Sequence, residues 1–234
     1  GIVWLAVDRA GYYSVVRATG YDPSAISDNA IEFAINGLGT KSDARGFVQG
    51  RFYWLTFPTS NRTFVYDLKF KKWHERLYYN ELTTAFEAHR AVTYAFFAGE
   101  HIVGDRATGT LYKLSDTTYT DQNGLGATNT LVRERTAPHI VKPGRSAVRA
   151  IHKALRLYME VGVGLDVVST TLGYDPQVML RFSNDGGKSW DQDWISVSAG
   201  KVGEYRAIAE WRQLGSTNIQ RTYAVRVTDP VPWK

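Results

Sequence analysis

Three hairpin-like segments with one shared pattern constrain the fold of this chain more than any other feature of its sequence. In each segment an aspartate ends an apolar run, a few turn-forming residues follow, and an aromatic residue lies in the returning run. The three aspartates are Asp8, Asp67 and Asp105. An aspartate at this position can accept hydrogen bonds from the backbone N–H groups that follow it and so fix the turn. The pattern predicts repeated antiparallel hairpins.

The spacing of these hairpins is typical of propeller blades. Asp67 and Asp105 are 38 residues apart, close to the roughly 40–45 residues of one blade. The 59 residues from Asp8 to Asp67 are too many for a plain blade, and residues 23–38 account for the surplus. Apolar side chains recur in that segment at the spacing of one helical face. We therefore expect a short helix inserted at about residues 24–38.

Two further strand candidates complete the first half. Residues 46–57 and 91–97 are rich in aromatic and β-branched side chains, as strands are. We therefore predict two or three blades within residues 1–120. A closed propeller usually has at least four, and we expect the others to lie before Gly1 in a longer parent chain or to come from a neighbouring chain. The apolar run that starts at Gly1 without an initiating methionine also favours a fragment or processed product.

The second half of the chain has a different pattern. The polar run SDTTYTDQNGLGATNT predicts a loop or linker at residues 121–142. Apolar and polar residues then alternate along several segments, which indicates antiparallel strands with one polar face: 151–161, 178–182, 205–211 and 223–227. The predicted fold is mainly β, with incomplete propeller-like blades at 1–120, the linker, and an antiparallel β-sandwich-like module at 143–234.

One turn within this module has a recognisable motif. The stretch RFSNDGGKSW places Ser183, Asp185, Gly187 and Trp190 at the spacing S-x-D-x-G-x-x-W. Serine and aspartate side chains can bond the backbone of the turn, glycine can adopt positive φ, and the indole can cover the turn. The motif resembles the Asp box of sialidases and other propellers, where it implies a structural turn.

That resemblance leaves a glycan-binding or glycan-hydrolysing propeller open as an alternative function. Sialidase chemistry needs an arginine cluster that binds a carboxylate, and a tyrosine nucleophile activated by a glutamate. Arginine and tyrosine are abundant in this chain, but the sequence does not group them. We therefore predict no catalytic residue.

A basic stretch offers a second alternative, a nucleic-acid-binding module. Over about 24 residues, Glu134 is the single acid among seven basic side chains, which are Arg133, Arg135, Lys142, Arg145, Arg149, Lys153 and Arg156. Such a set can neutralise phosphates or contact an acidic partner. The competing interpretation is a solvated loop and strand face.

Other classes of site are disfavoured by composition. The chain has no cysteine, so it has neither disulfides nor thiolate ligands, and its five histidines do not show the spacing of a zinc site. No run of about 18 apolar residues indicates a membrane span. We expect no metal, no cofactor and no membrane association.

Several collinear segments together resemble the packaged-DNA stabilisation proteins of short-tailed bacteriophages, which are head-completion or tail-hub proteins. The segments are 65–76, 103–114, 178–190, 203–206 and 211–215. The resemblance implies a propeller with appended β structure, no catalysis, and a place in the virion at the tail or neck. It further implies a homo-oligomeric ring that closes the portal channel, assembles with portal-adaptor, tail-needle and tailspike proteins, and contacts packaged DNA. The loops at 80–90 and 116–144 are candidate contact surfaces.

Overall fold

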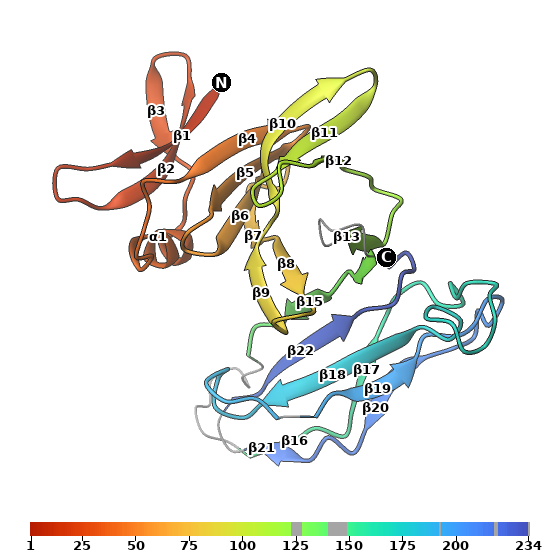
Figure 1. The fold of residues 1–234 in the computed structure, drawn as a ribbon. Helices are drawn as coiled ribbons and strands as arrows, with labels where there is room; N and C mark the ends of the chain where they lie inside the picture. Colours follow the sequence, from red (N-terminus) through yellow and green to blue (C-terminus); the bar gives the residue numbers. More distant parts are fainter. Residues whose placement is uncertain (123–127, 140–148, 192, 218–219, 234) are drawn as a thin grey trace. The chain divides into compact units, whose positions relative to one another are not determined.

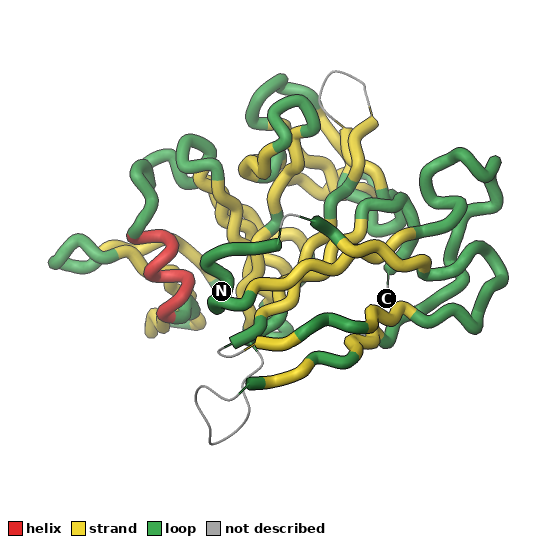
Figure 2. Tube along the Cα trace, turned by 90° about the horizontal axis from the view of Figure 1, so that it is seen from below, coloured by secondary structure: helices red, strands yellow, loops and turns green. Residues whose placement is uncertain are grey.

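The computed structural model describes residues 1–122, 128–139, 149–191, 193–217 and 220–233. These residues form two compact units, the first from Gly1–Asp116 with Gln122, and the second from Thr117–Asp121 with the described residues after Ala127. Nearly all regular structure in the described residues is β, with one helix in the first unit (Figures 1 and 2). The predicted mainly β fold class is therefore confirmed.

The first unit contains four antiparallel sheets. Their orders are β1-β2-β3, β4-β5-β6-β7, β8-β9 and β10-β11-β12. The strands are β1 (Ile2–Val7), β2 (Tyr13–Thr19), β3 (Asp22–Ala25), β4 (Arg45–Gln49), β5 (Phe52–Phe57), β6 (Arg62–Asp67), β7 (Lys72–Glu75), β8 (Leu77–Asn80), β9 (Ala85–Ala88), β10 (Ala91–Phe97), β11 (Glu100–Asp105) and β12 (Leu111–Lys113). The three larger sheets are consistent with propeller-like blades, as the hairpin spacing predicted.

Helix α1 (Asn29–Asn36) lies within the segment predicted to be helical. The Asp28 side chain caps its first turn by accepting the Ile31 N–H at 2.8 Å, and Ile35 is buried against the neighbouring sheet residues. The predicted start at residue 24 was too early, because residues 22–25 form β3. Pro23 is tolerated there since β3 is an edge strand and the missing N–H costs no ladder bond.

The core of the first unit surrounds β5 and β6. Both strands are buried along almost their whole length, because side chains on both of their faces are covered. On one face Tyr53 and Leu55 pack with Val3, Leu5 and other apolar residues of the first sheet. Burial on both faces explains why the apolar residues within these strands, 52–55 and 64–66, are consecutive and lack a two-residue period.

The second unit contains one large antiparallel sheet and several smaller ladders. A four-stranded sheet has the order β15-β22-β18-β19, and the pairs β17-β20, β16-β21 and β13-β14 form smaller ladders. Its strands are β13 (Thr120–Gln122), β14 (Thr128–Thr130), β15 (Arg133–Thr136), β16 (Ala150–Ile151), β17 (Ala154–Leu157), β18 (Gln177–Ser183), β19 (Ile195–Ser198), β20 (Ala209–Arg212), β21 (Ser216–Thr217) and β22 (Thr222–Val227). Val178 and Leu180 of the large sheet share one core with Leu155 and Trp211 of β17-β20.

Three boundaries differ from the sequence-based prediction. The prediction of a linker at 121–142 is wrong at Arg133–Thr136. These residues form β15, an edge strand of the large sheet that pairs with β22. The segment 205–211 is extended only from Ala209, because Gly200 and Gly203 have positive φ and a turn occupies 203–207. The 80–90 loop is largely the hairpin β8-β9. The predictions for residues 121–142 and 80–90 were wrong because the short strands there contain polar residues that are typical of turns.

No helix among the described residues combines the length and apolarity needed to cross a membrane.

Candidate functional site

The aspartates of the three repeated hairpins accept hydrogen bonds from the turns that follow them. Asp8 Oδ1 accepts the N–H groups of Ala10 and Tyr12 at 2.9 and 2.8 Å. Asp67 Oδ1 accepts the N–H of Lys69 at 2.8 Å, and Asp105 Oδ1 accepts that of Ala107 at 2.8 Å. These contacts confirm the predicted role of the aspartates in fixing the turns.

Two of these aspartates also bind an arginine that precedes the strand paired with their own. Arg51 Nε lies 3.2 Å from Asp67 Oδ2, and Arg90 Nε donates to Asp105 Oδ2 at 3.0 Å. The carbonyls of both arginines accept a backbone N–H, at 2.9 Å in each case, from the residue that follows the aspartate. We call each arrangement an Arg–Asp clasp. Its recurrence shows that the second and third blades share a detailed local geometry.

The two Arg–Asp clasps differ in burial. The side chains of Arg51 and Asp67 are 46% and 9% exposed, whereas those of Arg90 and Asp105 are 15% and 0% exposed. Burial alone would raise the pKa of Asp105, but hydrogen bonds from Ala107, Arg90 and Thr108 outweigh it and lower that pKa. The buried clasp therefore depends on full pairing of its charges.

An aromatic stack joins the second and third blades. The Phe47 ring stacks on Trp54 and on Tyr94, with centroids 5.4 and 5.7 Å apart. His89 lies 4.9 Å from Trp54, and its Nδ1 accepts the Ala91 N–H at 3.1 Å. An imidazole that accepts at Nδ1 is neutral with its proton on Nε2. Burial, with Arg76, Arg106 and Arg90 nearby, lowers the pKa of His89 to about 4.

The neutral imidazole of His89 predicts an acid-sensitive first unit. Unfolded His89 would bind a proton near pH 6.5, but the folded form binds it only near pH 4. The free energy of unfolding should therefore be fully retained above pH 6.5 and fall by up to about 3 kcal/mol as the pH drops from 6.5 to 4. His89→Asn keeps an acceptor near Nδ1 and should flatten this slope in urea unfolding curves. His139→Asn, at an exposed position, should leave it unchanged, and an equal slope in wild type and His89→Asn would contradict the assignment.

The Ser183–Trp190 turn is held by its own side chains. Ser183 Oγ donates to Asp185 Oδ1 at 2.7 Å and accepts the Gly187 N–H at 2.8 Å. Asp185 accepts the N–H groups of Lys188 and Ser189 at 2.9 Å. Gly187 has φ 96°, and Trp190 lies within 3.8 Å of where a Cβ would project from it. The four motif residues thus come together in one turn, as a structural role requires.

Asp185 should contribute to stability and not to bond making. Hydrogen bonds from the Ser189 side chain, the Ser189 N–H and the Ser183 side chain lower its pKa below the unfolded value of 3.8, so the stability from the carboxylate is full above that value and is lost as the pH falls through the lower folded pKa. Asp185→Ala should lower the melting temperature at pH 7 and speed hydrogen exchange of the Lys188 and Ser189 amides. Lys188→Ala, which keeps the backbone donors, is the control. Unchanged exchange at both amides in Asp185→Ala would contradict this role.

A buried arginine connects this turn to the rest of the second unit. Arg221 is 1% exposed. Its Nε donates to Asn184 Oδ1 at 2.9 Å, and its other nitrogens donate to the carbonyls of Leu214 and Ser216. Its guanidinium also lies 4.2 Å from the Phe182 ring centroid. Arg221 lies directly before β22, and its burial could not be predicted from the sequence because an arginine next to an alternating strand is usually exposed.

The basic stretch does not form one uniform surface. Arg133 donates to the carbonyls of Asp229 and Val231 and lies over the Tyr119 and Trp233 rings, so it is a structural residue. Arg156 lies 3.4 Å from Glu210. The exposed members that the structure describes are Arg135, Arg149, Lys153 and Arg156. Lys142 and Arg145 lie outside the described residues.

Two arginines meet on the outer face of the large sheet and share one glutamate as their partner. Arg181 and Arg226 donate to Glu134 at 2.9 and 2.7 Å. Both guanidinium groups lie 4.4 Å from the Trp194 ring centroid. A sialidase-type site would need arginines available to a substrate carboxylate, whereas this pair is occupied by Glu134.

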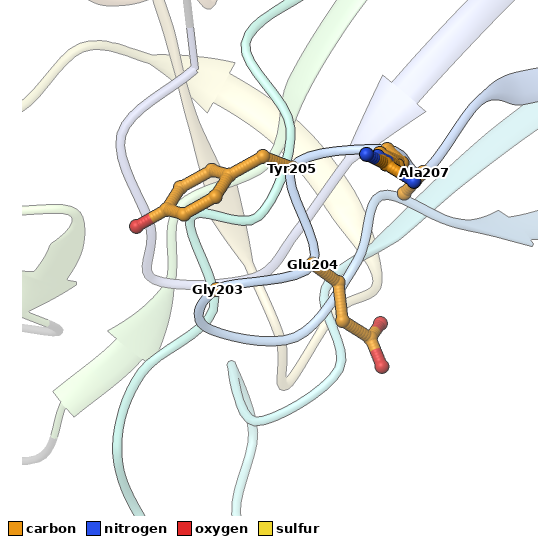
Figure 3. Close-up of a pocket in the computed structure, with 5 residues that line it drawn as sticks. Gly203, Glu204, Tyr205 and Ala207 are labelled. Carbon is orange, nitrogen blue, oxygen red and sulfur yellow. The ribbon is translucent and has the colours of Figure 1, made fainter.

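The other candidate ligand sites have little support. No group of three or more acidic or histidine side chains within the described residues could hold a metal ion. A hollow is lined by residues 203–207 of a single turn. Figure 3 shows the Glu204 and Tyr205 side chains pointing away from each other. Ligand sites normally bring several polar groups together, and this hollow does not.

Comparison with known proteins agrees with the architecture of the first unit. Residues 1–119 match the family model described as Bacteriophage P22 Gp10, beta-propeller, of the phage stabilisation family. A search of curated proteins found no match. The match covers just over half of the 234 residues and includes all three aspartate hairpins and both Arg–Asp clasps. The chain therefore belongs to the phage stabilisation family, whose members are structural proteins of the bacteriophage virion.

Proposed function

We propose that this protein is a hub of the phage tail or neck that closes the portal channel, stabilises packaged DNA and docks other tail proteins without catalysing a reaction. The observation that carries the proposal is the family match over the blades. It is supported by the use of the motif side chains as structural contacts, since Asp67, Asp105 and Asp185 all bind their own turns. Groups engaged in this way are not available to a substrate.

Exposed apolar side chains of the second unit supply surface for neighbouring virion proteins. Tyr158, Val168 and Tyr205 are 88%, 71% and 75% exposed. Aromatic side chains are enriched in permanent protein interfaces and contribute much of their binding energy. We assign such surfaces to contacts with portal-adaptor, tail-needle or tailspike proteins, and Arg135, Arg149 and Lys153 to acidic partners or packaged DNA.

The proposal is tested by DNA retention in phage particles. Particles assembled without this protein should fill with DNA and then lose it, so that the DNase-protected DNA falls, and adding purified protein before release should restore it. A variant carrying Tyr158→Ser and Val168→Ser should bind the particles less well, with Lys188→Ala as the exposed control. Equal DNA retention with and without the protein would overturn the proposal, as would turnover of sialosides by the purified chain.

A further inference from the structure

Basic side chains of the first unit gather around two phenylalanine rings. The guanidinium groups of Arg51 and Arg76 lie 4.8 and 4.6 Å from the Phe52 ring centroid. Around the Phe70 ring centroid, the Arg51 guanidinium lies at 5.2 Å and the Lys69 ammonium at 5.5 Å. Cations and rings therefore alternate, and the rings hold the cations in place through cation–π contacts.

The strand register adds a fourth cation to this group. Lys72 pairs with Asp67, which in turn pairs with Phe52. Directly opposite residues share one face of a sheet, so the Lys72 side chain emerges on the same face as the Phe52 ring. Strand β7, which begins at Lys72, is an edge strand of the β4-β7 sheet (Figure 1). We call these four residues the basic cluster: Arg51, Lys69, Lys72 and Arg76.

The basic cluster contains more cations than its surroundings balance. Asp67 lies 3.2 Å from Arg51, and within the described residues it is the single carboxylate that forms an ion pair with the basic cluster. Glu75 of β7 lies on the opposite face of the sheet and pairs with Arg62. Lys69 and Lys72 are exposed. The basic cluster therefore presents an excess of positive charge to solvent.

Arg76 is the member of the basic cluster whose charge is least satisfied. It is half-buried, and its Nε donates to His74 Nε2 at 3.1 Å. An imidazole nitrogen that accepts is unprotonated, so this partner is neutral. Burial is the main cause that lowers the pKa of Arg76; Asp116 opposes it through space, and the charge of Arg51 adds to the lowering. Arg76 thus stays positive at neutral pH in surroundings that do not favour its charge.

Two other arginines of the first unit show how such charges are normally satisfied. Arg90 pairs with Asp105, and Arg106 lies 3.0 Å from Glu87. Over the part of the chain that the structure describes, Arg76 makes no ion pair of this kind. Because charges removed from water are normally paired, the position of Arg76 favours an anion that a ligand supplies.

We propose that the basic cluster binds the phosphate groups of a nucleic-acid backbone. Its four charges have one sign, which matches the uniform charge of a phosphate backbone, whereas protein surfaces normally intersperse both signs. Guanidinium groups bind phosphate through two parallel hydrogen bonds. The Phe52 ring already contacts two guanidinium groups, which favours contacts to phosphates over stacking on bases. The inference goes beyond the proposed function, because it places a nucleic-acid contact on the propeller-like unit.

Fluorescence anisotropy of a short labelled DNA duplex tests the proposal on the 234-residue chain. Lys72→Gln and Arg76→Met each remove one cation, and methionine keeps an apolar stem against the Phe52 ring. Each phosphate contact that is lost should reduce the slope of log affinity against log salt by about 0.9. Wild-type affinity should therefore fall about 3.5-fold more than that of either variant between about 50 and 200 mM salt.

Lys113→Gln is the matched control for these variants. It changes the net charge by the same amount, but Lys113 already pairs with Glu100 at 2.6 Å. Its affinity and its salt slope should equal those of wild type. The basic residues of the second unit are the same in every variant, so the differences report on the basic cluster. Circular dichroism checks that each variant is folded.

Two results would overturn the proposal. One is a wild-type salt slope and affinity in both Lys72→Gln and Arg76→Met. The other is tighter binding of wild type to polyglutamate than to the duplex at equal salt, because the basic cluster would then prefer an acidic protein segment. DNA retention by phage particles is a separate readout, so failure here leaves the proposed function standing.

Discussion

Replacing Arg221 by methionine should lower the free energy of unfolding of the second unit by about 3–5 kcal/mol. Methionine keeps most of the apolar stem contact with Phe182 but removes the donors to Asn184 and to the carbonyls of Leu214 and Ser216. Each buried acceptor left without a donor costs about 1–3 kcal/mol. Urea unfolding followed by tryptophan fluorescence measures the change.

The control for Arg221 is an arginine of the same unit that reaches water. Arg212 binds Glu210 at 2.9 Å, but its side chain is 75% exposed. Exposed ion pairs contribute about 0–1 kcal/mol, so Arg212→Met should have a small effect. Arg221→Lys should be intermediate, because lysine keeps the charge but cannot reach three acceptors with one planar group. Equal losses for Arg221→Met and Arg212→Met would contradict the role of the buried guanidinium.

The second large effect is expected at the buried Arg–Asp clasp. Arg90→Met leaves the Asp105 carboxylate buried without its cation and removes the contact of the guanidinium with the Tyr78 ring. Breaking a buried pair on one side typically costs about 3–5 kcal/mol, and the first unit should lose about that much stability. Chemical unfolding monitored on the first unit gives the value.

The neighbouring blade supplies a matched control for this clasp. Arg51 makes the same backbone contact to the Asp67 turn and places its Nε 3.2 Å from Asp67 Oδ2, but its side chain is 46% exposed. Arg51→Met should therefore cost less than about 1 kcal/mol. The comparison separates burial from geometry, because both arginines hold equivalent positions. A loss at Arg51 as large as that at Arg90 would show that burial does not decide the contribution.

Local patterns in the sequence predicted the local structure well. The aspartate turns, the helix near Asp28 and the Ser183–Trp190 turn each depend on residues within a few positions of one another. Propensity and side-chain to backbone bonding act over that range. The alternation of apolar residues also predicted strands β18 and β22, since a two-residue period reports which side of a strand is buried.

Contacts between distant positions could not be predicted in the same way. Arg221 and Asn184 are 37 residues apart in sequence, and Arg90 and Asp105 meet only after their hairpin has folded. The charge of the basic stretch likewise did not show which arginines have structural partners. Arg133 donates to carbonyls near residue 231, whereas Arg135 is exposed. The sequence did contain one sign of the Arg–Asp clasps. Arg51 and Arg90 are separated by nearly the same number of residues as Asp67 and Asp105.

The charged residues of the repeated turns act as structural contacts within the first unit. A double-mutant cycle on Arg90 and Asp105 measures this most directly, using Arg90→Met, Asp105→Asn and the double variant in urea unfolding at pH 7. The two losses should be strongly non-additive, with an interaction free energy of about 1–3 kcal/mol. Additive losses, with an interaction free energy near zero, would contradict the claim.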